Sequence, residues 1–177
     1  MTSLVYLFRR INDNVAIAVG LILLGCVLFT LVEITARKLG GALGGVDEIS
    51  GYVMAITTSW GISYALTEQA HVRIDLLRQR LVPFGRAFFD LISIACLAGT
   101  AIVVAWRGWS VLEKTLSTGA RANTPLETPL WIPQLLWWTG WLWFAISASI
   151  LLLSVLIKFS SFDYKSIDKI AGARGEA

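Results

Sequence analysis

The stretch PQLLWWTGWLWFAISASILLLSVLI, residues 133–157, contains no charged residue. At about 1.5 Å of rise per residue, a helix of this length crosses the roughly 30 Å hydrocarbon core of a bilayer. Pro133 suits the first turn of such a helix, because that position needs no backbone N–H donor. The stretch therefore predicts a transmembrane helix.

Three further uncharged runs occupy residues 15–32, 49–67 and 91–106. Charged residues make up 15% of the chain, whereas an average soluble domain carries about 25%. We therefore expect an all-α membrane protein with a single membrane domain over residues 1–177. Its four transmembrane helices are predicted at about 15–36, 48–67, 87–107 and 133–157, followed by a cytoplasmic tail at 158–177.

The distribution of positive charge predicts the orientation of these helices, because Lys and Arg are retained on the cytoplasmic side. With the N-terminus inside, ten of the 15 Lys and Arg residues fall on the inner side and five on the outer side. We therefore expect both termini in the cytoplasm.

An amphipathic pattern precedes the first predicted span. Over residues 3–13, Leu4, Leu7 and Phe8 share one helical side, with Arg9 and Asn12 largely on the other. Such a segment is typical of a helix that lies on the membrane surface. We expect an interfacial helix at about 3–13 on the inner side.

A second amphipathic pattern follows the third span. Trp109, Leu112 and Leu116 have helical spacing, which predicts another interfacial helix in the outer connection. Residues 117–128 then contain Gly119 and Pro125 and are interpreted as an exposed loop.

Seven of the eight tryptophans lie near the end of the third span or the start of the fourth. Indole rings favour the headgroup boundary, because the N–H stays hydrated while the ring leaves water. An aromatic belt at the outer interface and a docking surface for another protein both fit this cluster. Its members are Trp106, Trp109, Trp131, Trp137, Trp138, Trp141 and Trp143.

Small residues recur every four positions in the second span, at Gly51, Ala55, Ser59 and Ser63. They share one helical face, and small faces let helices approach closely in lipid. Two interpretations remain open, which are packing within this chain and a seam against a different membrane protein.

Two acidic groups lie at the outer ends of the first two spans. Glu33 and Arg37 are four residues apart in the order that favours a helical ion pair. Asp47 and Glu48 open the second span, where the helix dipole stabilises acids. Each group is interpreted as structural or as a contact with a partner protein.

Several function classes are excluded by what the sequence lacks. His71 is the single histidine, and Cys26 and Cys96 both lie within spans, so ligands for haem or zinc are missing. No phosphate-binding glycine loop, serine nucleophile motif or basic nucleic-acid stripe occurs. Spans that form a transport site normally contain buried ionisable groups or broken helices. The middles of these spans contain no charged residue and no proline. We expect no enzyme activity, no cofactor, no nucleic acid and no independent transport.

Residues 46–81, VDEISGYVMAITTSWGISYALTEQAHVRIDLLRQRL, carry the most specific pattern. Asp47 and Glu48 open the segment, Trp60 and Gly61 lie mid-span, and HVRIDL follows at 71–76. This segment resembles the small membrane subunit, or Q type, of tripartite ATP-independent periplasmic (TRAP) transporters. Elsewhere the similarity is confined to the four-span layout and Pro133.

The resemblance implies a complex with a large membrane subunit and a periplasmic substrate-binding protein. In that family the large subunit carries sodium and an organic acid, such as a C4-dicarboxylate, sialic acid or sugar acid, by an elevator motion. The small subunit enlarges the static scaffold. The alternative is a free-standing tetraspan structural or regulatory protein; a small intramembrane enzyme or electron carrier fits poorly.

Three groups of residues follow from this interpretation. The expected subunit interface comprises Gly51, Ala55, Ser59, Trp60 and Ser63. The outer residues Glu33, Arg37, Asp47 and Glu48 are expected near the docked binding protein. The inner loop, with contacts to phospholipid headgroups, is expected to include His71, Arg73, Asp75 and Arg78.

Overall fold

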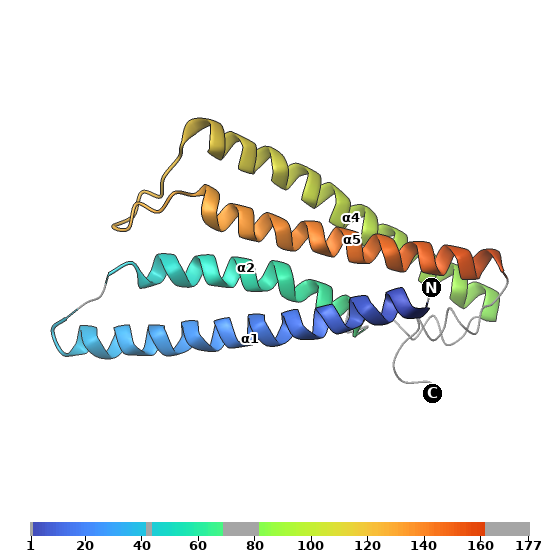
Figure 1. Ribbon diagram of the computed structural model, residues 1–177, viewed down its shortest axis with the longest axis horizontal. Coiled ribbons are helices and arrows are strands. Elements are labelled where there is room, and N and C mark those ends of the chain that lie inside the picture. The colour runs from blue at the N-terminus through green and yellow to red at the C-terminus, as the bar shows by residue number, and fades with distance from the viewer. Residues whose placement is uncertain (1, 42–43, 69–81, 162–177) are drawn as a thin grey trace.

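The computed structural model describes residues 2–41, 44–68 and 82–161. Nearly all of these residues belong to four long helices (Figure 1), and no strand is formed within these ranges. The prediction of an all-α chain with four long helices is confirmed for this part of the chain. The helices are α1 (Thr2–Lys38), α2 (Val46–Thr67), α4 (Pro83–Thr118) and α5 (Trp131–Ser160).

Glycine and proline set several helix boundaries. Gly45, which precedes α2, has φ 72°, a left-handed conformation that side chains with a Cβ rarely adopt. Pro83 occupies the first turn of α4, where its missing N–H costs no hydrogen bond. Gly119 ends the same helix at φ 60°, and the N–H of Ala120 then donates to the Thr115 carbonyl.

Three helices are long and apolar enough to cross a membrane, over Leu7–Lys38, Phe84–Thr118 and Trp131–Ser160. The prediction of a span is confirmed by length and composition for these three. The 22-residue helix α2 is also long enough, but its many hydroxyl-bearing and small residues make it less apolar. That α2 spans the membrane therefore stays a prediction.

The two predicted interfacial helices are not separate elements. Residues 3–13 continue into the first span as one 37-residue helix, and 109–116 are the end of the 36-residue α4. Neither junction contains a proline or a glycine pair, which are the usual causes of a sharp kink. The structure therefore shows no break between either predicted interfacial segment and its span, and the location of these segments at the membrane surface stays a prediction.

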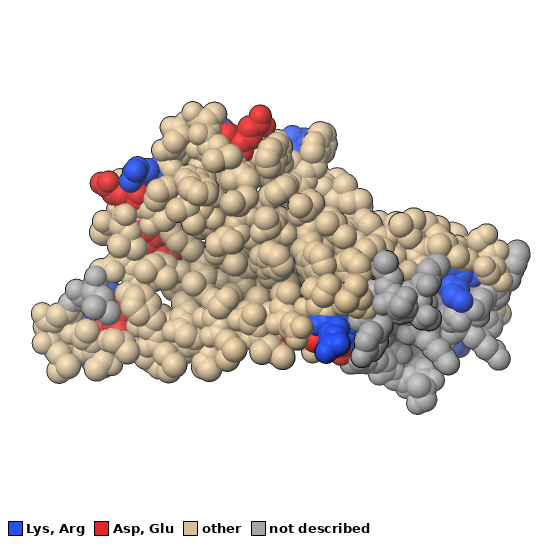
Figure 2. All heavy atoms as spheres, viewed as in Figure 1, with Lys and Arg blue, Asp and Glu red and all other residues tan. Residues whose placement is uncertain are grey.

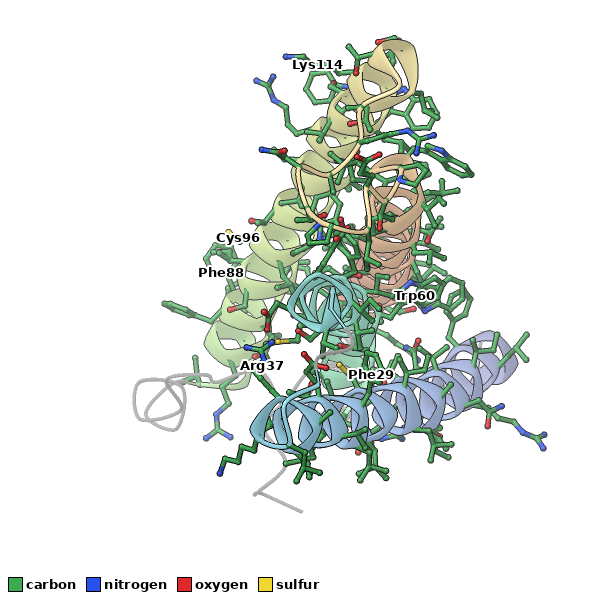
Figure 3. The ribbon with its side chains drawn as sticks, turned by 90° about the vertical axis from the view of Figure 1, so that its left-hand side faces the viewer. Phe29, Arg37, Trp60, Phe88, Cys96 and Lys114 are labelled. Atoms are coloured by element: carbon green, nitrogen blue, oxygen red, sulfur yellow. The ribbon has the colours of Figure 1, made fainter. Side chains whose placement is uncertain are left out.

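The helices form an open row rather than a closed bundle. Helix α1 packs on α2, α2 on α5 and α5 on α4, while α1 and α4 share no comparable contact within the described residues. Seen from the end that carries the α1–α2 connection, α2 lies between α1 and the α4–α5 pair (Figure 3). Trp60 and Cys96 project from opposite sides of this row.

The apolar core lies where α2, α4 and α5 meet. Alanines on α4 let α5 approach closely, and Leu66 of α2 packs on the same cluster. Elsewhere the surface is apolar, and Figure 2 shows a broad uncharged region across the middle of the visible face. The buried cluster comprises Leu66, Ala98, Ala101, Ala105, Phe144, Ala145 and Ala148.

Candidate functional site

Helices α2 and α5 approach each other closely at Ser59 and Gly140. A Cβ on Gly140 would lie 2.9 Å from the backbone carbonyl carbon of Ser59, so only glycine fits without a shift. Ser59 is 2% exposed, and Ser63, one turn further, is fully buried. These two members of the small-residue face therefore pack inside the chain.

Trp60 belongs to the same internal seam. Its indole Nε1 donates to the Leu136 carbonyl of α5 at 3.0 Å. The ring is half-buried, and its hydrogen bond locks the two helices one turn away from Gly140. A residue predicted to face a partner subunit is therefore used, in this chain, to join α2 to α5.

The other members of the small-residue face are open. Gly51 and Ala55 are exposed, and a Cβ on Gly51 or Gly61 would meet no other described residue within 4 Å. Nine residues, or two and a half turns, separate Gly51 from Trp60, so they point to opposite sides of α2. The predicted interface is thus divided between a seam inside the chain and an unoccupied face.

Asn12 joins three helices, and sequence reasoning missed it. Its side chain is fully buried; Nδ2 donates to the Ser63 carbonyl at 3.3 Å, and Oδ1 accepts from the Trp143 indole Nε1 at 2.8 Å. Phe8 stacks on Trp143 with 5.2 Å between ring centroids. Asn12 is four residues from Phe8, so a helix places both side chains on the same side. This spacing was the signal in the sequence that Asn12 belongs to the packing side of α1.

Arg9 also contacts α2, because its guanidinium forms an ion pair with Glu68 at 3.1 Å. Arg9 and Asn12 had been assigned to the polar side of an interfacial helix that faces headgroups. In the structure both attach the start of α1 to the rest of the protein. The predicted polar side is therefore, in part, a packing side.

Internal hydrogen bonds also change the interpretation of the tryptophan cluster. The Trp138 indole donates to the Ala105 carbonyl of α4 at 2.8 Å. Trp143, whose indole donates to Asn12, lies about 18 Å along the axis of α5 from Trp131. The donors of Trp138 and Trp143 are therefore satisfied by the protein. Trp106 is 70% exposed and remains available to a headgroup or a partner.

The predicted ion pair between Glu33 and Arg37 is present, with 3.0 Å between Glu33 Oε1 and Arg37 Nη2. Glu33 is 3% exposed, whereas the Arg37 side chain is 63% exposed. A docked protein can therefore reach Arg37 but not the Glu33 carboxylate in this arrangement. The expectation that both face the binding protein remains a proposal for Arg37 alone.

Asp47 and Glu48 lie in the first turn of α2, as predicted, but no side chain caps that helix. The Glu48 Oε1 instead accepts from the Tyr52 hydroxyl at 2.8 Å, and its Oε2 accepts from the Thr124 hydroxyl. Thr124 belongs to the connection between α4 and α5. Asp47 is exposed.

That connection, residues 120–130, forms a hairpin, which we call the outer hairpin after the side on which the predicted orientation places it. An isolated β-bridge pairs Arg121 with Pro129, and the Ala122 N–H donates to the Thr128 carbonyl at 2.9 Å. At its tip Leu126 covers Gly45, where a Cβ would lie 2.5 Å from the Leu126 side chain. The hairpin therefore reaches across to the start of α2.

The predicted inner-loop residues His71, Arg73, Asp75 and Arg78 lie outside the described residues, as does the HVRIDL segment. Within the described ranges, no group of three or more His, Cys, Asp or Glu side chains comes together to hold a metal ion.

The matching family model is "Tripartite ATP-independent periplasmic transporters, DctQ component", over residues 26–162, more than half of the chain. No curated protein and no solved structure was found to match the chain. The family consists of transporter components rather than enzymes, and works with a large membrane subunit and a periplasmic binding protein. Together with the apolar helices, this makes the chain a multi-pass membrane protein. The chain belongs to the DctQ family and is the small membrane component of a TRAP transporter.

Proposed function

We propose that this chain is a static scaffold for the large membrane subunit, in sodium-driven and binding-protein-dependent uptake of an organic acid. It sits in the bacterial inner membrane with both termini in the cytoplasm. C4-dicarboxylates, sialic acid and sugar acids are the substrate classes that the family suggests. The chain itself moves no solute.

The observation that carries the proposal is the open face of α2. Gly51, Ala55, Thr58 and Gly61 lie on it at spacings of three to four residues, and Gly51, Ala55 and Thr58 are exposed. Glycine in a helix costs about 1 kcal/mol relative to alanine. Since no described part of the chain needs that space, a close neighbour outside the chain explains the glycines best.

The composition of α2 supports the same proposal. Its open face carries the Thr58 hydroxyl, and the helix lacks a stretch as apolar as those in the other three helices. Lipid hydrocarbon tails gain no favourable interaction from a glycine or a hydroxyl, whereas a neighbouring helix can pack closely on both. We therefore place a transmembrane helix of the large subunit against Gly51, Ala55, Thr58 and Gly61, instead of the face formed by Ser59, Trp60 and Ser63.

Anchoring is the physical contribution expected of such a scaffold. An elevator transporter needs one part fixed in the bilayer while another slides. Helix α1 exposes a long apolar side, and the exposed Trp106 and Trp109 lie on α4 near its end. Interfacial aromatic residues resist tilt and vertical displacement.

The first test is assembly and transport. The chain, tagged and co-expressed with the large subunit, should be purified and reconstituted in liposomes with the binding protein and a sodium gradient. We expect co-purification, and uptake that is lost when this chain is omitted. Saturable uptake by this chain alone would contradict the proposal, and a monodisperse chain that never retains the large subunit would favour a free-standing protein.

The second test locates the contact. A photo-crosslinking amino acid at Thr58 should give a covalent product with the large subunit, because that position is placed in the seam. The control position is Leu21, which is 64% exposed on α1. Crosslinking at Leu21 but not at Thr58 would place the large subunit on α1 instead.

A further inference from the structure

At the end of the protein that carries the outer hairpin, this hairpin joins the α4–α5 pair to the α1–α2 pair. From Ser59 toward the C-terminal end of α2, two contacts join α2 to α5: Gly140 packs closely on Ser59, and the Trp60 indole donates a hydrogen bond to the Leu136 carbonyl. Toward the start of α2, Gly51 and Ala55 are exposed, and Figure 1 shows α4 and α5 diverging from α1 and α2 at this end. The hairpin tip crosses this divergence and contacts the first turn of α2.

Glu48 is the centre of that contact. One of its carboxylate oxygens accepts from the Tyr52 hydroxyl of its own helix and the other from the Thr124 hydroxyl at the hairpin tip, and Thr128 of the hairpin also interacts with the carboxylate. A carboxylate accepts through both oxygens, whereas an amide accepts through one oxygen only. Tyr52 therefore orients the carboxylate, and Thr124 and Thr128 are the hairpin residues that Glu48 holds, Thr124 across 76 residues of sequence.

A hydrophobic contact accompanies this hydrogen bond. The Leu126 side chain fills the space above Gly45, where a Cβ would lie 2.5 Å from it. Within the hairpin, Glu127 has a positive φ of 46°, and its N–H donates to the Thr124 carbonyl at 3.0 Å. The tight turn at the tip thus presents Thr124 and Leu126 together to the start of α2.

We propose that Glu48 is a positioning residue that holds the outer hairpin on α2 and so sets the surface on which the soluble binding protein docks. This inference rests on the proposed function, since it assumes that this end of the protein is periplasmic. The Glu48 carboxylate acts through the hairpin and makes no contact with the transported solute.

The first readout is the position of the hairpin. Spin labels at Asn123→Cys and Leu39→Cys, in a chain with Cys26→Ser and Cys96→Ser, report the distance from the hairpin tip to the end of α1. In lipid nanodiscs we expect a narrow distance distribution that broadens in Glu48→Gln and in Thr124→Val. Glu113→Gln, which removes an exposed acid from α4, should leave it narrow. A distribution unchanged by both Glu48→Gln and Thr124→Val would overturn the inference.

The second readout separates positioning from assembly. In liposomes with the complete complex, Glu48→Gln should raise the binding-protein concentration for half-maximal uptake several-fold, with unchanged maximal rate and co-purification. Thr124→Val should act in the same direction, and the double variant should be no worse than Glu48→Gln alone. Additive effects, or a loss of maximal rate alone, would contradict the inference. Uptake by the wild-type complex that needs no binding protein would instead contradict the proposed function.

Discussion

The two halves of α2 carry the same kind of small residue but use them differently. Near its C-terminal end, Ser59 and Ser63 are buried against the rest of the chain. Near its N-terminal end, Gly51 and Ala55 are exposed while α4 and α5 diverge. A small-residue face therefore identifies where a helix can approach, but it does not say whether that helix belongs to the same chain.

The largest loss of stability is expected for a substitution at Gly140, in the buried seam between α2 and α5. Gly140→Leu forces a side chain into the Ser59 backbone, and overpacking of this kind costs about 3 kcal/mol. In detergent, the thermal unfolding midpoint should fall strongly for Gly140→Leu. It should not change for Gly51→Leu, because the space above Gly51 is open. Equal melting of the two variants would mean that the two halves of α2 do not differ.

The loss of Asn12 should rank second. Asn12→Leu leaves the Trp143 indole donor without its acceptor inside the protein, at a cost of about 2 kcal/mol. The thermal midpoint and the Trp fluorescence spectrum should both change. Asn14→Leu, at an exposed position of the same helix, is the matched control and should leave both unchanged. A wild-type midpoint for Asn12→Leu would remove this three-helix contact from the account.

Trp60→Phe should cost less, because it removes one hydrogen bond and little apolar area. The lost bond to the Leu136 carbonyl is worth about 1 kcal/mol. Trp106→Phe serves as the control, since Trp106 is largely exposed. The same detergent melts should rank Trp60→Phe below Asn12→Leu in effect, and a reversed order would show that Trp60 is the stronger link.

The smallest effect is expected for Arg9→Gln. The Arg9–Glu68 pair is exposed on the arginine side, and such pairs contribute at most about 1 kcal/mol. Its contribution should also fade as salt is raised, because exposed charges are screened. A large, salt-independent loss of stability on Arg9→Gln would show that this pair is buried in the membrane-bound protein.

Uncharged length was enough to predict the four helices, because a span must satisfy its backbone internally over a fixed thickness. That α1 and α4 each continue without a break was not predictable from amphipathicity alone. An amphipathic side looks the same whether its polar residues face headgroups or contact other helices. Asn12 and Arg9 do the second, and their partners Ser63, Trp143 and Glu68 are distant in sequence.

The candidate site was predicted in part for a related reason. The spacing of Gly51, Ala55, Ser59 and Ser63 predicted one small-residue face, but the structure divides these residues between a seam inside the chain and an open face. The role of Glu48 could not be read from the sequence, because its partner Thr124 lies in a segment interpreted as a loop. Glu33 and Arg37, four residues apart on one helix, were predictable as a pair.

The most direct test of the central claim is the double variant Gly51→Leu with Gly61→Leu, compared with Gly25→Leu on α1, whose Cβ also meets open space. The alternative neighbour at all three positions is lipid. The account predicts that both proteins melt like wild type when purified alone, and that only the double variant fails to retain the large subunit. Recovery of the large subunit at the wild-type level by the double variant would contradict it.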